Sequence, residues 1–530
     1  MSLADRVQER AEARRWWILA VLCFSLLVIV LDNSILNVAL PTIVRELDAS
    51  NAQLQWIVDS YTIVFAGLLL TAGSLGDRFG RRPALQFGFV VFGLGSAAAA
   101  LVGSAGGLIA TRSVMGVGGA FIMPATLSII TNVFPPWERG RAIGVWAATA
   151  GVGVALGPLT GGFLLEHFYW GSIFLVNLPI VVVGLVAGVF LIPDSKDPTG
   201  APLDVGGAAL SIAGLGALLF ALIEAPEQGW TDPLTLGGFA IGALLLLGFA
   251  WWERRCEHPM LDVSFFANPR FSAASAAVTL TFFAMFGSLF VLTQYLQFIL
   301  GYSALETGVR LLTFAIPMMI LAPSSSRFVE VVGTKAVVAT GMSLAATGFV
   351  LLSFVDATTS FASLSWRLVT LASGMGLTMA PATESIMGSL PRGKAGVGSA
   401  VNDTTRQVGG ALGVAVIGSV FASIYRSGIT DDVGRDALPP GLRDEAADSL
   451  GAALAIAGQL GADGLGLATA ARDAFIDGMR AGRWIGAFVV AVGVVVTLLF
   501  LPAHGRDVDE PALDAGPGDR PGTPAGTTPN

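Results

Sequence analysis

Four ionisable residues interrupt apolar stretches in which a charge is costly. Asp32 lies in VLDNSILNVALP (residues 30–41), and Asp59, Arg112 and Glu384 lie in three other stretches. A charged side chain at bilayer depth costs several kcal/mol, so such residues are retained mainly for function. Burial disfavours the charged form of a carboxylate, whereas a neighbouring arginine favours it. The chemistry that these residue types predict is therefore the reversible binding of a proton inside the membrane.

Helical geometry places three of these residues at a similar depth. At 1.5 Å per residue, Asp32 lies about 22 Å along its helix from Trp17, and Arg112 lies about 9 Å below the outer end of its own helix. Asp59 lies at a similar depth in the second stretch. We therefore expect the three side chains to share one layer. A purely structural ion pair is the alternative for Asp32, and for Asp59 the structural and functional roles stand equal.

The elements that position these residues are membrane-spanning helices. Of the 530 residues, 54% are hydrophobic and only 13% are charged, whereas a soluble protein averages about 25% charged residues. Fourteen apolar stretches are about as long as the roughly 20 residues that a spanning helix needs. The 66 glycines suit the close packing of such helices. We therefore predict an all-α polytopic membrane protein.

The basic residues predict how the chain is oriented in the membrane. Short loops that contain Lys or Arg all fall on one side if the N-terminus is cytoplasmic, and the opposite loops contain few of either. The positive-inside rule therefore predicts a multi-pass protein of the cell membrane with both termini in the cytoplasm. The basic residues behind this prediction are Arg14, Arg15, Arg78, Arg81, Arg82, Arg139, Arg141, Lys196, Arg254, Arg255, Arg327, Lys335, Arg392 and Lys394.

A weak internal repeat divides the chain into two halves. Residues 123–130 read MPATLSII and residues 380–387 read APATESIM, and each copy follows an arginine and several glycines. Two related halves with a site between them near the midplane are a common plan of transporters. Glu384 replaces Leu127 of the first copy near the cytoplasmic end, where it either reaches solvent or helps to admit a cationic substrate.

Composition divides the chain further into segments. The tail is rich in Pro and Gly, which predicts disorder, and Pro439-Pro440 is expected to begin a short helix. The predicted segments are a cytoplasmic N-terminus (1–15), a six-helix bundle (16–192), a cytoplasmic linker (193–204), two inserted spanning helices (205–253), a second six-helix bundle (254–503) with an extracytoplasmic segment (427–483), and a disordered cytoplasmic tail (504–530).

Several short motifs resemble those of a known family. GSLGDRFGRRP (73–83) resembles the loop signature G-x-x-x-D-R-x-G-R-R of the major facilitator superfamily. TRSVMGVGGAFIMP (111–124) resembles its fourth-helix signature, and GVGVALGPLTGG (151–162) resembles the fifth-helix signature of its antiporters. LDNSILNVALP, WGSIFLVNLP (170–179) and NDTTRQVGGALG (402–413) are similar to its fourteen-helix drug:proton antiporters. The resemblance implies a major facilitator fold of two six-helix halves with two inserted helices.

The resemblance also implies roles for individual residues. Asp32 and Arg112, with Asp59 as a further candidate, would couple proton binding to transport. The cytoplasmic gating loop would consist of Gly73, Gly76, Asp77, Arg78, Gly80, Arg81 and Arg82. The bent fifth helix would carry Gly151, Gly157, Pro158, Gly161 and Gly162. Because acidic and aromatic side chains suit organic cations, the candidates for a substrate cavity are Asp32, Asp59, Glu384, Phe282, Phe286 and Phe290.

The implied function is proton-driven export of amphiphilic, cationic compounds by alternating access, and the alternative is export of a lipid, an antibiotic or a siderophore. Two cysteines and three histidines provide no metal cluster and no clustered catalytic set. GSLPRGKA (388–395) lacks the hydroxyl that a phosphate-binding loop needs. We therefore expect a monomeric transporter without enzymatic activity, cofactor, metal, nucleotide or nucleic acid, whose partners are membrane lipid, protons and an amphiphilic small molecule.

Overall fold

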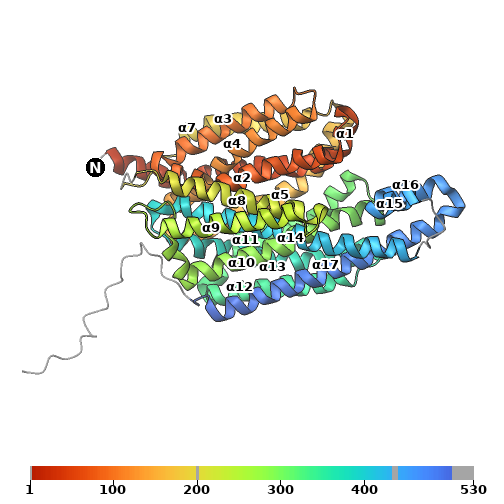
Figure 1. The fold of residues 1–530 in the computed structure, drawn as a ribbon. Coiled ribbons are helices and arrows are strands. Elements are labelled where there is room, and N and C mark those ends of the chain that lie inside the picture. The colour runs from red at the N-terminus through yellow and green to blue at the C-terminus, as the bar shows by residue number, and fades with distance from the viewer. Residues whose placement is uncertain (1–2, 199–201, 433–439, 504–530) are drawn as a thin grey trace, which may run out of the picture.

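The computed structural model describes residues 3–198, 202–432 and 440–503, which form helices and contain no strand (Figure 1). Twelve of the helical segments described there are long and apolar enough to cross a membrane. They are α1 (Leu3–Leu47), α2 (Asn51–Phe79), α4 (Ala105–Val133), α5 (Pro136–His167), α6 with α7 (Ser172–Leu175 and Asn177–Leu191), α8 (Val205–Gln228), α9 (Pro233–Glu253), α10 (Pro269–Gln294) with a π-turn at Tyr295–Ile299, α11 (Ala304–Val332), α12 (Thr334–Ser353), α14 (Ala395–Asp432) and α17 (Leu465–Phe500). The predicted all-α membrane architecture is confirmed.

Two further long helices, α3 (Arg81–Ala99) and α13 (Phe361–Gly388), run beside these segments although they carry more polar residues. α3 packs along α4, where Gly118 faces the backbone of Phe92. α13 packs along α12, where Gly374 faces the backbone of Ala345. By length and hydropathy, twelve helical segments of the described residues qualify as spans. The predicted number of fourteen would also include α3 and α13, and it remains a prediction.

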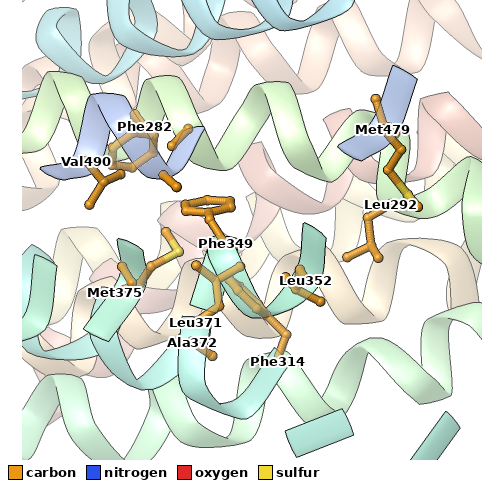
Figure 2. Close-up of a cluster of buried hydrophobic side chains, with 14 of the residues drawn as sticks. Phe282, Leu292, Phe314, Phe349, Leu352, Leu371, Ala372, Met375, Met479 and Val490 are labelled. Atoms are coloured by element: carbon orange, nitrogen blue, oxygen red, sulfur yellow. The ribbon is translucent and has the colours of Figure 1, made fainter. Parts of the chain in front are cut away.

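Each half of the chain has its own hydrophobic core. One cluster of buried residues comes mainly from residues 18–222 and the other mainly from residues 249–501. The first half, red to yellow in Figure 1, lies above the second half, green to blue. Figure 2 shows part of the second core, where Phe282, Leu371 and Val490 gather around Phe349. Two separate cores are what two rigid bodies that move against each other would require.

The inserted helices α8 and α9 pack on each other and bridge the two halves. α8 contacts α2 of the first half and α14 of the second half. Gly67 of α2 faces the carbonyl of Ile212, and Trp230, in the turn after α8, donates from Nε1 to the hydroxyl of Ser419 at 2.9 Å. The inserted pair is therefore attached to both halves rather than to one.

The two copies of the sequence repeat lie on corresponding helices. Pro124 lies inside α4, and Pro381 lies inside α13. α4 packs against α3 in the first half as α13 packs against α12 in the second half. The repeat in the sequence thus corresponds to a repeat in the packing.

Some ends of the helices differ from the sequence expectation. α1 begins at Leu3, inside the segment predicted as a separate N-terminus, and α17 begins at Leu465 although the apolar stretch begins near Trp484. Residues 465–483 mix charged and apolar side chains. They are helical but less hydrophobic than the part of α17 that begins near Trp484. The outer segment also contains α15 (Pro440–Asp448), which begins at Pro440 as predicted, and α16 (Leu450–Leu460). The tail predicted to be disordered, 504–530, lies outside the described residues.

Candidate functional site

Asp32 of α1 and Arg112 of α4 form a buried ion pair. Asp32 is 2% exposed and Arg112 is fully buried. Nη1 of Arg112 binds Oδ2 of Asp32, while Nδ2 of Asn177 donates to Oδ1 of the same carboxylate at 2.9 Å. The structure therefore brings the two predicted coupling residues into direct contact, and both oxygens of the carboxylate have a donor.

The rest of the Arg112 guanidinium is also occupied. Nε donates to the carbonyl of Ile57 at 3.3 Å, and Nη2 donates to Oδ1 of Asn33 at 3.3 Å. The guanidinium carbon lies 4.3 Å from the centre of the Tyr61 ring, on the same helix as Ile57. Because a buried polar or charged group needs hydrogen-bond partners, this shell provides the partners that a buried guanidinium beside Asp32 requires.

Asn177, at the start of α7, is a site residue that the sequence reasoning did not select. Its Nδ2 bonds both Asp32 and the hydroxyl of Ser96, at 2.9 and 3.1 Å, and Ser96 donates to the carbonyl of Phe174. Its Oδ1 is buried and has no hydrogen-bond partner. An amide can exchange donor for acceptor by rotation, so Asn177 can serve either the ionised or the protonated form of the carboxyl group. A lone amide in the apolar run WGSIFLVNLP was the available signal.

Asp59 does not contact this pair, although its position on α2 between Ile57 and Tyr61 is compatible with the predicted common depth. Ile57 and Tyr61 are four residues apart and both face Arg112. Asp59 lies between them in sequence, and at about 100° per residue it projects from the other side of α2. The charges that act on it belong to Glu224 and Glu227 of α8. The rise of a helix predicts depth but not direction, so the role of Asp59 in proton coupling remains a prediction.

The glycines of α5 bring this helix close to α1 at the level of the ion pair. A Cβ on Gly157 would lie 2.1 Å from Oγ of Ser34, and Gly161 packs on Ile35. Pro158 cannot donate to the carbonyl of Val154 four residues earlier, and the Ser34 hydroxyl of α1 donates to that carbonyl at 3.2 Å instead. The α1–α5 contact thus completes the hydrogen bonding of a helix that its own proline interrupts.

The remaining two glycines of the predicted fifth-helix motif have different surroundings. Gly151 makes ordinary contacts with Ala315 and Met318 of α11, in the other half. Gly162 has open space where a Cβ would stand. Close packing against α1 therefore depends on Gly157 and Gly161 rather than on the whole motif.

Asp77 joins the end of α2 to the start of α14 in the other half. Oδ1 of Asp77 accepts from the backbone N–H of Gly396 at 2.8 Å, and Oδ2 accepts from that of Val397 at 3.0 Å. Both amides belong to the first turn of α14, where the helix dipole favours an anion. Gly73 contacts the same turn, with the carbonyl of Gly396 at 2.5 Å from a Cβ placed on Gly73. The two halves are thus closed against each other at this end, called the gating-loop end below.

The arginines of the gating loop differ in what they hold. Arg81 is buried, pairs with Asp77 at 2.7 Å and donates to the carbonyl of Arg392 in the other half at 2.7 Å. Arg82 reaches only the carbonyl of Ile192, at 3.5 Å. Arg78 lies over the ring of Phe79. Arg81 therefore forms a hydrogen bond between the halves.

The backbone of the gating loop is tight. Gly80 has φ +116°, a conformation that L side chains rarely adopt, and a Cβ there would meet Oδ1 of Asp194 at 2.7 Å. A Cβ on Gly76 would contact Ala84. The segment after α7 completes the contact, because the N–H of Asp197 donates to the carbonyl of Asp77 at 2.7 Å. Gly80 is thus the glycine that the turn requires.

Glu384 lies at the gating-loop end, between α13 and α5. Its Oε2 is 2.4 Å from the position of a Cβ on Gly140 of α5. The next turn of α5 makes a second contact between the halves, where Gly144 packs on the backbone of Ala322 in α11. The structure therefore places Glu384 in the contact between the halves, and its predicted place in a substrate cavity remains a prediction.

The second half contains its own buried carboxylate and arginine, Asp403 and Arg406 of α14. The nearest atoms of the pair are 3.9 Å apart, and Nη2 of Arg406 donates to the hydroxyl of Thr383 on α13 at 3.1 Å. The guanidinium lies 4.9 Å from the Trp146 ring of α5 and 5.3 Å from the Phe282 ring of α10. Arg406 therefore touches both halves. NDTTRQ was noted as a motif, but the Asp and Arg within it were not selected.

The predicted aromatic cavity residues lie on α10. Phe282 is 6% exposed, packs edge to face with Phe286 at 5.4 Å and faces Arg406. Phe286 also covers Gly410 of α14. The side chain of Phe290 lies outside what the structure describes. Their role in binding substrate remains a prediction.

Comparisons with known proteins agree with this architecture. A family model described as Major Facilitator Superfamily matches residues 22–414. The multidrug efflux pump LfrA of Mycolicibacterium smegmatis is 36% identical over 494 residues, which cover 93% of this chain and 97% of LfrA. The tetracenomycin C resistance and export protein of Streptomyces glaucescens is 33% identical over 491 residues, covering 92% of this chain and 91% of that protein.

Solved structures show the same fold. The crystal structure of the human organic anion transporter MFSD10 matches with a TM-score of 0.59 and 15% identity, covering 92% of this chain and 99% of that one. The predicted two-half architecture is thereby confirmed at the level of the fold. Family model, relatives and fold agree, and the chain belongs to the Major Facilitator Superfamily.

Proposed function

We propose that this protein exports amphiphilic, cationic drugs across the cell membrane in exchange for protons. The observation that carries the proposal is the buried Asp32–Arg112 pair with its donor Asn177. The relatives support drug export, because one is named a multidrug efflux pump over nearly the whole length of both chains. Both termini would be cytoplasmic and the protein would act as a monomer in the lipid bilayer.

Asp32 would bind the proton that drives transport. In the ionised form its carboxylate would be held by Arg112 and Asn177, whose contacts with Asp32 support this role. A proton on Asp32 would remove the charge that Arg112 pairs with, and the unpartnered Oδ1 of Asn177 would accept the new O–H group. Arg112 would keep Ile57 and Asn33 but lose its anionic partner. Protonation would thus change the contacts among α1, α4 and α7 together.

The gating loop would set which side of the membrane the site faces. Asp77 and Arg81 close the halves against each other at the gating-loop end, which the positive-inside rule places in the cytoplasm. This structure would therefore represent a state whose cytoplasmic side is closed. Opening that side requires Asp77 to leave the first turn of α14. Protonation of Asp32 would remove its attraction to Arg112. This change would shift the balance between the state closed toward the cytoplasm and the state open toward it.

The energy available is sufficient for drug export. One charge that crosses a potential of 100 mV is worth about 2.3 kcal/mol. Because about 1.4 kcal/mol corresponds to a tenfold ratio, each net charge that moves inward sustains roughly a 50-fold gradient of substrate. Exchange of one proton for one monovalent cation moves no net charge, so the pH difference alone drives it, and each pH unit sustains about a tenfold gradient. Exchange of a proton for an organic cation needs no nucleotide.

The test is dye export by proteoliposomes with an imposed pH gradient. The parent protein should move a fluorescent organic cation uphill only while the gradient lasts, and Asp32→Asn should stop uphill movement while the protein still inserts and folds. A matched control is Asp262→Asn, which removes a carboxylate that caps the short 3₁₀ turn before α10. Uphill export that needs no gradient would contradict proton coupling.

Export of a dedicated antibiotic is a second candidate function. One observation favours it: the similarity to the tetracenomycin C resistance and export protein extends over 91% of that protein, whose name refers to a single antibiotic. The same proteoliposomes distinguish the two functions. Competition with the dye by a panel of unrelated organic cations supports multidrug export, whereas competition by tetracenomycin C and by none of the cations supports the second candidate.

A further inference from the structure

Two carboxyl groups face each other where the inserted helices begin and end. Asp204 caps the start of α8, and its Oδ1 accepts from the N–H of Gly207 at 2.7 Å and from Nε1 of Trp252 at 2.8 Å. Glu253 is the last residue of α9, and its Oε2 accepts from the N–H of Leu261 at 3.2 Å. Each carboxyl group therefore has one oxygen that is fully used.

The other two oxygens are buried and lack a donor. Oδ2 of Asp204 and Oε1 of Glu253 have no hydrogen-bond partner, although Glu253 is only 3% exposed. Both oxygens lie within 2.5 Å of the position of a Cβ on Gly207, so they point at the same spot. The two carboxyl groups are within hydrogen-bonding reach of each other.

Two ionised carboxylates in this arrangement would be unstable. Both oxygens are acceptors, and an unsatisfied buried acceptor costs about 1–3 kcal/mol, more when it is charged. A single shared proton resolves the conflict, because a protonated carboxyl group becomes a donor to the carboxylate that faces it.

The charged groups around this pair do not replace the proton. A small pocket beside Asp204 is lined by the ionisable residues Asp77, Arg78, Asp197, His258 and Lys394. Lys394 pairs with Asp197 at 3.9 Å, and Arg255, two residues after Glu253, lies over the ring of Trp251. Asp204 is the charge that acts on Glu253. Lys394 and Arg255 thus interact with other partners.

We propose that Asp204 and Glu253 form a second proton-binding site, in which one shared proton joins the start of α8 to the end of α9. The proton bridges Oδ2 of Asp204 and Oε1 of Glu253, and Glu253 in turn holds the loop 254–262 through the N–H of Leu261. Release of the proton leaves two negative charges face to face, and their repulsion moves the Glu253 side chain away from Asp204 and out of line with the Leu261 N–H. The loop also lines the pocket together with Asp77 of the gating loop. In the orientation proposed above, the site senses the pH of the cytoplasm, and that consequence rests on the proposed function.

The first test detects the proton itself. The infrared spectrum of the purified protein should contain a protonated-carboxyl band that is lost in both Glu253→Gln and Asp204→Asn. Glu257→Gln, which changes an exposed carboxylate four residues away, should keep the band. Two single variants are used so that, if one of them fails to fold, the other still tests the band. Retention of the band in both variants would overturn the proposal.

The second test follows the loop. The hydrogen-exchange rate of the Leu261 amide should rise about tenfold per pH unit, in addition to the rise of the intrinsic exchange rate. The reason is that breaking the bond between Leu261 and Glu253 releases one proton from the carboxyl pair. Glu253→Gln should abolish this excess, since the amide of Gln donates permanently to Asp204. Equal pH profiles in parent and Glu253→Gln would refute the shared proton. Asp32→Asn should stop export without changing this profile, so failure of the proposed function is distinguishable from failure of this inference.

Discussion

The two halves each bury a carboxylate and an arginine, but they bind them differently. Arg112 contacts Asp32 directly, and every nitrogen of its guanidinium has an acceptor, one on α2 and two on α1. Arg406 lies 3.9 Å from Asp403, and both Nε of Arg406 and Oδ2 of Asp403 lack a hydrogen-bond partner. The first pair is complete within its own half. The second is under-satisfied and lies where the halves meet.

The difference indicates a division of roles. In the Asp32–Arg112 pair every guanidinium nitrogen already has an acceptor. Such a pair is changed chiefly by neutralisation of one charge, which binding of a proton to Asp32 would cause. An incomplete pair framed by Trp146 and Phe282 has unused polar atoms and two aromatic faces at the contact between the halves. Such a set can accept new contacts from a ligand or change partners when the halves move. We therefore expect the Asp32–Arg112 pair to govern coupling, and the Asp403–Arg406 pair to affect substrate and conformation more than proton binding.

The largest expected effect separates the two arginines by stability. Arg112→Ala leaves Asp32 buried without its cation, and breaking a buried pair costs about 3–5 kcal/mol. Arg406→Ala removes a hydrogen bond to Thr383 and a weak ion pair, for which we expect about 1–3 kcal/mol. Thermal unfolding of the two variants in detergent measures the difference. Equal destabilisation would contradict the comparison.

The next effect separates the two carboxylates by coupling. Asp403→Asn should keep uphill export under a pH gradient, with an apparent substrate affinity lowered about tenfold, which corresponds to about 1.4 kcal/mol. Asp32→Asn should lose uphill export and still bind substrate. Dye export and dye binding, measured on the same preparations, give both quantities. Uphill export that survives in Asp32→Asn and fails in Asp403→Asn would reverse the assignment.

A smaller effect is expected at Asn177. Asn177→Leu removes the donor to Asp32 and the acceptor for its protonated form, and the loss of one hydrogen bond to a charged group is worth about 1.5–3 kcal/mol. The initial rate of gradient-driven export should fall about tenfold or more. The matched control is Asn33→Leu, which removes one acceptor from Arg112 and no donor from Asp32. Its export rate should fall less than that of Asn177→Leu. The same loss in both variants would show that Asn177 has no special part.

The smallest effect is expected at Asp59. Because its side chain faces α8 and its acidic neighbours are Glu224 and Glu227, Asp59→Asn should change gradient-driven export by less than about twofold, the range of ordinary surface substitutions. The measurement is the same export assay. A complete loss, like that expected of Asp32→Asn, would place Asp59 in the coupling path despite its direction on α2.

Depth along a helix could be predicted from the sequence, and direction could not. The rise per residue brought Asp32 and Arg112 to one level, and the structure confirms that they meet. The same rule placed Asp59 at that level, but its phase on α2 turns it away from Ile57 and Tyr61, which contact Arg112. Phase depends on how each helix is rotated by its neighbours, and one sequence does not contain that information.

Partners without charge were the other part that the sequence did not reveal. Asn177 and Ser34 are ordinary polar residues in apolar runs, and their importance comes from what faces them: an ionised carboxylate in one case and a carbonyl freed by Pro158 in the other. Asp403 and Arg406 had a visible signal, since two opposite charges three residues apart in an apolar stretch are costly. The loop signature was more informative, because Gly80 is fixed by the local turn at φ +116°, although the partner of Asp77 lies in the other half.

The most direct test of the central claim is proton release on substrate binding. Purified protein in weakly buffered detergent solution, at a pH where the parent is loaded with protons, is mixed with a fluorescent organic cation while the pH is followed. The account predicts that the parent releases protons in proportion to the dye bound, and that Asp32→Asn binds dye and releases none. Proton release that is unchanged in Asp32→Asn would show that the proton is carried elsewhere.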